Sequence, residues 1–192
     1  QPASRGGGER IMTTLVAGLV LFLGVHLLPT VPPLREGLRA RLGNGLYKGF
    51  FSLVSLGGLL LIVRGMRLAP AVSVYSPPAH GYRLTVALML VALILLVAAY
   101  VPSNVKRYTR HPMLWGVVLW SVGHLFANGD LAGLLLFASF GVYALVDMIS
   151  ANRRGAALQE RRLPWTRDIL VVVIGVAVYL VVSAWHARLM AG

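Results

Sequence analysis

Two histidines stand thirteen positions apart in the segment RHPMLWGVVLWSVGHLFANGD, residues 110–130. They are His111 and His124, and the residues between them are almost all apolar. Ionisable side chains inside a membrane are costly, so those that occur there usually have a partner or a function. On one helix the two rings would lie about 20 Å apart along the axis and about 220° apart around it. Each imidazole therefore needs its own partner from another helix.

His124 lies on a helical stripe with Gly116, Trp120 and Asn128, which follow one another at intervals of four residues. His26 is another histidine within an apolar run. Counting helix rise from the predicted membrane boundaries puts it about 9 Å from the depth of His124 and about 9 Å from that of His111. Depth alone does not choose between these partners. In the plainest interpretation, His26 and His124 hydrogen-bond across helices.

Six apolar runs of about 16 to 21 residues supply the helices that must position these side chains, and roughly 20 residues cross a bilayer core. The chain is 57% hydrophobic and 12% charged, whereas a soluble domain carries about a quarter charged residues. The sequence therefore predicts an all-α polytopic membrane protein, a bundle of about six transmembrane helices. These are predicted at residues 11–28, 46–63, 84–101, 112–127, 131–149 and 169–189.

The first eleven residues are rich in Gly and Arg and show no apolar periodicity. We interpret residues 1–11 as a disordered or non-native leader, with Met12 as a candidate natural start, and residues 12–192 as a single transmembrane domain. A secretory signal peptide is the competing interpretation of the first run. That run contains His26 and lacks an Ala-x-Ala cleavage site, so we expect the helix to be retained.

The net charge of +12 is unevenly distributed. With six spans, the side reached after the first, third and fifth helices carries twelve of the eighteen Lys and Arg residues, counting Lys48 and Arg167 next to its loops. The positive-inside rule places these loops, residues 32–45, 102–110 and 152–166, in the cytoplasm and both termini outside. Anionic lipid headgroups are sufficient partners for this charge, and we expect no nucleic acid. The chain has no cysteine, which excludes disulfides, thiolate nucleophiles and iron–sulfur clusters.

Asp147 is an acidic residue near the cytoplasmic end of the fifth predicted helix. An unpaired carboxylate at that depth is costly. We therefore expect Asp147 to lie close to Arg110, Arg107 or His111.

Three segments of the chain resemble the NnrU family of membrane proteins. They are GVHLLP around His26, LYKGFFSLVSL from Leu46 onward, and RHPMLWG followed by LWxxGHLxxNGD. The resemblance extends from about residue 12 to residue 150, and the last helix resembles the family in hydropathy only. Bacterial members are linked to denitrification, in which they are needed for production or activity of nitrite and nitric oxide reductases. A plant relative is 15-cis-ζ-carotene isomerase, a membrane enzyme that contains haem b.

The resemblance implies that His26 and His124 are the axial ligands of a haem b, with His111 as the fallback metal ligand. Haem iron in a helix bundle takes ligands that project inward from facing helices, and a neutral imidazole suits this role. His80 and His186 are weaker candidates, because we expect them near the outer surface.

Further cofactor contacts follow from the same resemblance. The Trp120 ring would form a flat wall beside His124, and Gly116 would leave a gap for the porphyrin. Asn128 would orient the imidazole. His111 would be a capping or binding residue at the cytoplasmic end of its helix, in a motif with Arg110 and Pro112.

Three functions remain open on these grounds. The first is a haem-binding protein of nitrogen-oxide metabolism in the bacterial inner membrane, with both termini periplasmic. It would support a nitrite or nitric oxide reductase or the maturation machinery of one. The second is a cis-trans isomerase of a lipid-soluble polyene, by analogy with the plant relative. The third is a membrane methyltransferase that uses S-adenosylmethionine, because RHPxxxG, from Arg110 to Gly116, is also similar to isoprenylcysteine methyltransferases. Their carboxylate and aromatic signature after the final helices has no match here.

Overall fold

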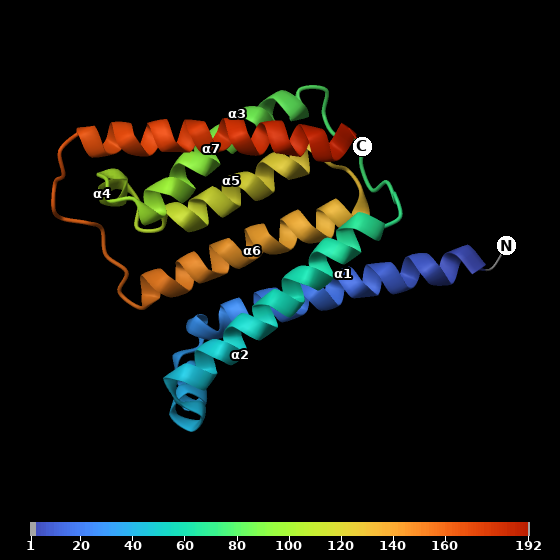
Figure 1. Ribbon diagram of the computed structural model, residues 1–192, viewed down its shortest axis with the longest axis horizontal. Helices are drawn as coiled ribbons and strands as arrows, with labels where there is room; N and C mark the ends of the chain where they lie inside the picture. Colours follow the sequence, from blue (N-terminus) through green and yellow to red (C-terminus); the bar gives the residue numbers. More distant parts are fainter. Residues whose placement is uncertain (1–2, 192) are drawn as a thin grey trace. The chain divides into compact units, whose positions relative to one another are not determined.

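The computed structural model describes residues 3–191, with side chains described for residues 7–186 and 188. Within this range an isolated bridge between Ser73 and Asp130 is the one β-type pairing. Five helices are long and apolar enough to cross a membrane, and α5 is a shorter apolar helix. This confirms the predicted all-α class. The elements are α1 Ala3–Leu27, η1 Leu28–Thr30, α2 Pro32–Leu68, α3 Gly81–Tyr100, α4 Val105–Tyr108, α5 Pro112–Ala127, α6 Leu131–Arg153 and α7 Thr166–Ala191 (Figure 1).

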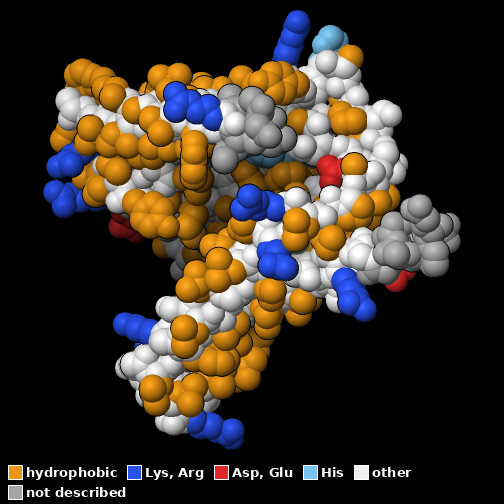
Figure 2. All heavy atoms as spheres, turned by 45° about the vertical axis from the view of Figure 1, so that its right-hand side comes forward, with side chains coloured by type: hydrophobic (Ala, Val, Ile, Leu, Met, Phe, Trp, Pro, Cys, Tyr) orange, Lys and Arg blue, Asp and Glu red, His pale blue; other side chains and the backbone are white. Residues whose placement is uncertain are grey.

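Large hydrophobic side chains lie on the surface of the membrane-length helices. Leu53 in α2 is 72% exposed, and Val181 in α7 is 69% exposed. Figure 2 shows hydrophobic side chains over much of one face. Water would disfavour such a surface, whereas lipid tails are as apolar as leucine. The exposed apolar side chains therefore indicate a helical membrane protein.

The chain forms two compact units, which are described separately here. The first consists of Gln1–Ser76 and Asn128–Tyr143, and the second of Pro77–Ala127 and Ala144–Gly192. Helix α6 contributes residues to both units. The prediction of a single transmembrane domain over residues 12–192 stays a prediction.

In the first unit, α1 and α2 pack closely against each other. Leu15, Leu19 and Ile62 form a buried cluster with Ala132 of α6. The close approach depends on glycine: a Cβ atom added at Gly65 would lie 2.7 Å from the Leu15 Cα. Membrane helices associate through such small residues because hydrophobic burial alone does not drive contact within lipid.

Both N-terminal helices are longer than predicted. Residues 3–10, assigned from the sequence to a leader, are helical and continuous with the first apolar run; their non-native origin stays a prediction. Helix α2 begins at Pro32 and includes the whole segment predicted as the loop 32–45, so that prediction was wrong. Proline is favoured at the start of a helix. The helix is kinked at Gly43, whose φ of 73° is a conformation that glycine adopts at little cost.

The turn before α6 is held by hydrogen bonds within the first unit. A carboxylate oxygen of Asp130 accepts the Gly133 backbone N–H at 2.8 Å and so caps the helix. The Tyr75 hydroxyl donates to the Asn128 carbonyl at 2.6 Å. Burial, and then the negative charge of Asp130, raise the pKa of the Tyr75 hydroxyl above its usual value.

In the second unit, α3 packs against both α5 and α7 (Figure 1). A Cβ atom added at Gly116 of α5 would lie 2.9 Å from the Ala92 carbonyl oxygen of α3. The Thr85 hydroxyl of α3 lies within hydrogen-bonding distance of the Gly123 carbonyl of α5. These contacts hold α5, the helix that carries His111 and His124, close against α3.

Candidate functional site

His26 lies in the last turn of α1, in the first unit, and its ring is oriented by its own helix. The Nδ1 atom lies 2.7 Å from the Phe22 carbonyl oxygen, one turn earlier. A carbonyl oxygen can only accept a hydrogen bond, so Nδ1 must carry the proton. The neutral ring then has its lone pair on Nε2, which has no hydrogen-bond partner in the described part of the chain. A lone pair on Nε2 is what a metal ligand requires.

Aromatic side chains surround the His26 ring. Phe22 stacks on it with ring centroids 4.2 Å apart, and Phe51 of α2 meets it edge-on at 5.1 Å. Tyr143 of α6 lies at 6.3 Å and nearly perpendicular. Three helices therefore enclose this half-buried imidazole in an apolar aromatic site.

His124 lies in the last turn of α5, in the second unit, and is oriented in the same way as His26. Its Nδ1 atom lies 2.9 Å from the Trp120 carbonyl oxygen, again one turn earlier. The same argument assigns the proton to Nδ1 and the lone pair to Nε2. The Trp120 ring is tilted against the imidazole at 5.2 Å. Trp120 therefore contacts His124 as the four-residue spacing predicted.

The structure corrects the interpretation of Gly116. The sequence suggested that Gly116 leaves a gap for a porphyrin, but the Ala92 carbonyl and the Leu96 side chain of α3 occupy the space beside it. This residue permits close helix packing. Asn128 belongs to the first unit and His124 to the second, and the role of Asn128 in orienting the imidazole stays a prediction.

His186, which the sequence gave as a weaker candidate, is a neighbour of His124. It comes from α7, and the two ring centroids are 6.4 Å apart at an interplanar angle of 70°. The sequence placed His186 near the outer end of its helix but carried no signal for which residue it would face. The second unit thus contains a pair of imidazoles on two helices.

His111 lies at the start of α5 and takes part in a different interaction. Its Nε2 atom lies 3.0 Å from the amide oxygen of Asn152, at the end of α6. Because that oxygen accepts, Nε2 of His111 carries the proton. Pro112 follows as the first residue of α5, and Arg110 is exposed. The RHP motif therefore begins α5 and ties it to the C-terminal end of α6.

The predicted partner of Asp147 was wrong. The carboxylate pairs with Arg154 at 3.6 Å, rather than with Arg110, Arg107 or His111. Arg154 follows Asp147 by seven residues, which places the two on the same face two helical turns apart. A local partner from the turn directly after the same helix therefore satisfies the carboxylate.

His26 and His124, each considered separately, have the ring orientation expected of a metal ligand. Metal-binding histidines usually donate their second ring N–H to a carbonyl or carboxylate, which orients the ring. His26 and His124 both do so. The described residues contain no group of three or more His, Cys, Asp or Glu placed to hold a metal ion, whereas haem iron can be held by one or two axial side chains.

The model of the NnrU protein family matches residues 14–192 of the chain. The chain belongs to the NnrU family. No curated protein and no solved structure gives a significant match. The match to the NnrU model includes α7 and hence His186, beyond the segment whose motifs resembled the family.

Proposed function

We propose that this NnrU protein binds haem b in the membrane through His124 and His26 and acts in nitrogen-oxide metabolism. The observation that carries the proposal is the shared arrangement of the two rings. Each Nδ1 lies within hydrogen-bonding distance of the carbonyl oxygen one turn earlier, so in the neutral ring the lone pair is on Nε2, a nitrogen through which histidine commonly binds metals. Membership of the NnrU family supports the link to denitrification.

The residues around each histidine suit the cofactor. The aromatic rings of Phe22, Phe51 and Tyr143 make the surroundings of His26 apolar, and low polarity is one of the means by which a protein sets a haem potential. Trp120 offers a flat ring beside His124. Bound haem would supply one-electron redox chemistry.

His186 is a second candidate for the partner of His124. The observation in its favour is the separation of 6.4 Å between the two ring centroids within one unit. In a linear imidazole–iron–imidazole arrangement the ring centroids are about 6 Å apart, since iron–nitrogen bonds are about 2 Å long. Either His26 or His186 would hold a haem together with His124, and the spectrum of the variants would distinguish the two.

The test is the absorption spectrum of the purified chain titrated with haem. We expect a Soret band of a six-coordinate, low-spin iron in the wild type. Either His26→Ala or His186→Ala should convert it to a five-coordinate, high-spin spectrum, and that variant identifies the second ligand. A wild type that takes up no haem would contradict the whole proposal. If neither variant changes the spectrum, both ligand pairs are wrong.

Conversion of a cis-polyene by the haem-loaded chain would favour the isomerase function over the supporting role in denitrification.

For localisation we propose the bacterial inner membrane, with residues 102–110 and 152–166 in the cytoplasm and both termini in the periplasm. The basic residues of these loops support this orientation. The chain has no cysteine, so single cysteines can be labelled without background. Ala156→Cys should be protected from a membrane-impermeant maleimide in intact cells, and Ala79→Cys should be labelled. The reverse pattern would overturn the orientation.

Co-purification with a nitrite or nitric oxide reductase, or with its maturation proteins, tests the proposed partners.

A further inference from the structure

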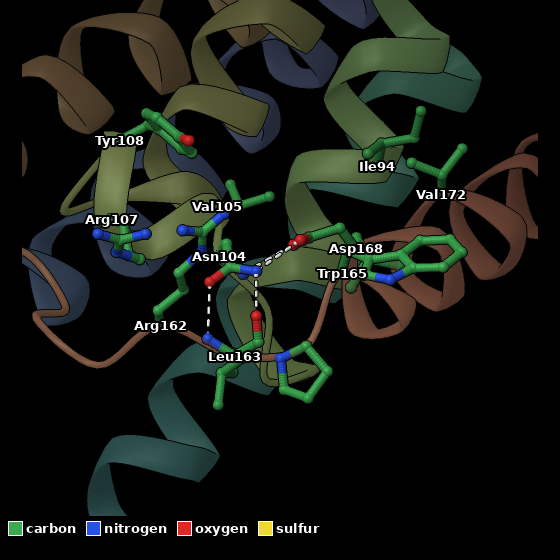
Figure 3. A pocket seen from close by; sticks show the side chains of 12 residues that line it. Ile94, Asn104, Val105, Arg107, Tyr108, Arg162, Leu163, Trp165, Asp168 and Val172 are labelled. Carbon is green, nitrogen blue, oxygen red and sulfur yellow. Dashed lines mark hydrogen bonds between the residues drawn. The ribbon is translucent and has the colours of Figure 1, made fainter.

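A cavity of about 770 Å³ lies in the second unit, where the end of α3 and the short helix α4 meet the start of α7 (Figure 3). Its walls differ in chemistry. In Figure 3 Arg107, Arg162 and Tyr108 lie on one side, and Ile94, Val172 and Trp165 lie on the other. The residues that matter here are Arg107, Arg162, Tyr108, Ile94, Trp165 and Val172.

Arg107 and Arg162 have no internal partner. Neither guanidinium forms a hydrogen bond or an ion pair within the described part of the chain. Asp168 also lines the cavity, but its two carboxylate oxygens accept the backbone N–H of Asn104 at 2.7 Å and its side-chain amide at 2.6 Å. The guanidinium donors of the two arginines are therefore not used within the described structure, and their positive charge favours an anionic ligand.

The same hydrogen bonds make the cavity wall a fixed structure. The Asn104 amide also donates to the Leu163 carbonyl at 3.0 Å and accepts the Leu163 N–H at 2.9 Å. This links α4, the segment before α7 and the first turn of α7 (Figure 3). The backbone segments that carry Arg107 and Arg162 are therefore already fixed before a ligand binds. This reduces the conformational entropy lost on binding.

The apolar side of the cavity belongs to the membrane helices. Ile94 and Val172 come from α3 and α7, both long and apolar enough to cross a membrane. Trp165 is 70% exposed and Tyr108 is 84% exposed at the mouth of the cavity. Tryptophan and tyrosine are enriched at the level of lipid headgroups. The cavity therefore joins a cationic headgroup region to the hydrocarbon region.

We propose that this cavity binds one anionic phospholipid. Its phosphate lies between Arg107 and Arg162, and the upper part of an acyl chain lies against Ile94 and Val172. Arginine binds phosphate through two parallel N–H donors. A free phosphate ion would use the cationic side only, whereas a phospholipid matches both sides. The site is separate from the proposed haem ligands.

The test is binding of short-chain lipids to the purified full-length chain in neutral detergent, measured by native mass spectrometry. The probes are dioctanoyl phosphatidylglycerol, dioctanoyl phosphatidylcholine and inorganic phosphate. We expect one saturable phosphatidylglycerol site, with weaker retention of phosphatidylcholine and no saturable binding of phosphate. The double variant Arg107→Gln/Arg162→Gln should weaken phosphatidylglycerol binding about 25-fold, at about fivefold per arginine. The control, Arg35→Gln/Arg41→Gln, removes two exposed charges outside the cavity and should bind like the wild type.

Three outcomes would overturn the proposal. One is equal loss of binding in both double variants, which would mean attraction by overall charge. Another is equal retention of phosphatidylcholine and phosphatidylglycerol by the wild type. The third is saturable binding of inorganic phosphate as tight as that of phosphatidylglycerol, which would make the site one for a free anion. Circular dichroism of the variants checks that the helices are intact. Should the double variant fail to fold, the single variant Arg162→Gln, at an exposed position, takes its place with an expected fivefold loss, about one arginine's share.

Discussion

The two ends of α5 each carry a histidine, and the two rings are held in opposite ways. At the start of the helix, His111 donates from Nε2 to the side chain of Asn152 on α6. At the end of the helix, His124 donates from Nδ1 to the Trp120 carbonyl of its own helix. One ring uses its outer nitrogen to tie two helices together. The other uses its inner nitrogen locally and keeps the lone pair on its outer nitrogen.

This difference explains how one helix can use the same residue type for two purposes. A bond to the carbonyl one turn earlier needs no other element, so the helix itself sets the protonated nitrogen of His124. A bond to Asn152 requires α6 to be in place, and it engages the outer nitrogen, Nε2, of His111. We therefore propose a structural role for His111 and a cofactor-binding role for His124.

The largest effect should come from His124→Ala. We expect this variant to lose the Soret band of the haem-titrated protein while it still folds and inserts in the membrane. His111→Ala is the matched control at the other end of the helix, and it should keep the band. Imidazole added to His124→Gly should restore part of the absorbance, because it can replace the missing ring. If His124→Ala keeps an unchanged spectrum, His124 is a packing residue.

Gly116 lies between the two histidines and tests whether α5 must be seated against α3. A Val side chain there would meet the Ala92 carbonyl and the Leu96 side chain. We expect Gly116→Val to lower the free energy of unfolding by about 1–3 kcal/mol, the usual cost of overpacking. The measurement is thermal unfolding in detergent. Gly49→Val is the control, since a Cβ atom at Gly49 has no neighbour within 4 Å in the described structure. Equal effects of both substitutions would argue against the close α3–α5 contact.

The bond between His111 and Asn152 should contribute about 1 kcal/mol to stability. A double-mutant cycle with His111→Ala and Asn152→Ala isolates this contribution. We expect the double variant to be little worse than either single variant, while haem binding is unchanged in all three. Strictly additive effects would mean that the two side chains act independently.

The smallest effect should come from the pair formed by Asp147 and Arg154. The side chains are 19% and 32% exposed and 3.6 Å apart, and such pairs contribute under about 1 kcal/mol. Asp147→Asn and Arg154→Gln should each lower the unfolding temperature slightly, with coupling between them. If the effect of Asp147→Asn on the unfolding temperature were instead coupled to that of Arg110→Gln, the result would support the pairing expected from the sequence.

The sequence by itself determined that this protein is helical and where several of its helices lie. Lipid cannot satisfy backbone N–H and C=O groups, so apolar runs of sufficient length must be helical. For this reason α5 has the predicted bounds, residues 112–127, and α6 begins at the predicted Leu131. Helix periodicity likewise placed Trp120 one turn before His124. Hydropathy was less informative at charged segments, and so residues 32–45, which are helical, were predicted as a loop.

Only the tertiary structure decided which residues meet across helices. The rotation and crossing angle of two helices follow from close packing at small residues such as Gly65 and Gly116. The depth of a side chain in the membrane predicts neither of them. The proximity of His186 to His124, and the bond from His111 to Asn152, could not be derived from hydropathy or spacing for this reason. The cavity with Arg107 and Arg162 likewise exists because Asn104 joins segments about sixty residues apart in the chain. Local interactions along the chain determined the helices, and packing between distant segments brought their side chains together.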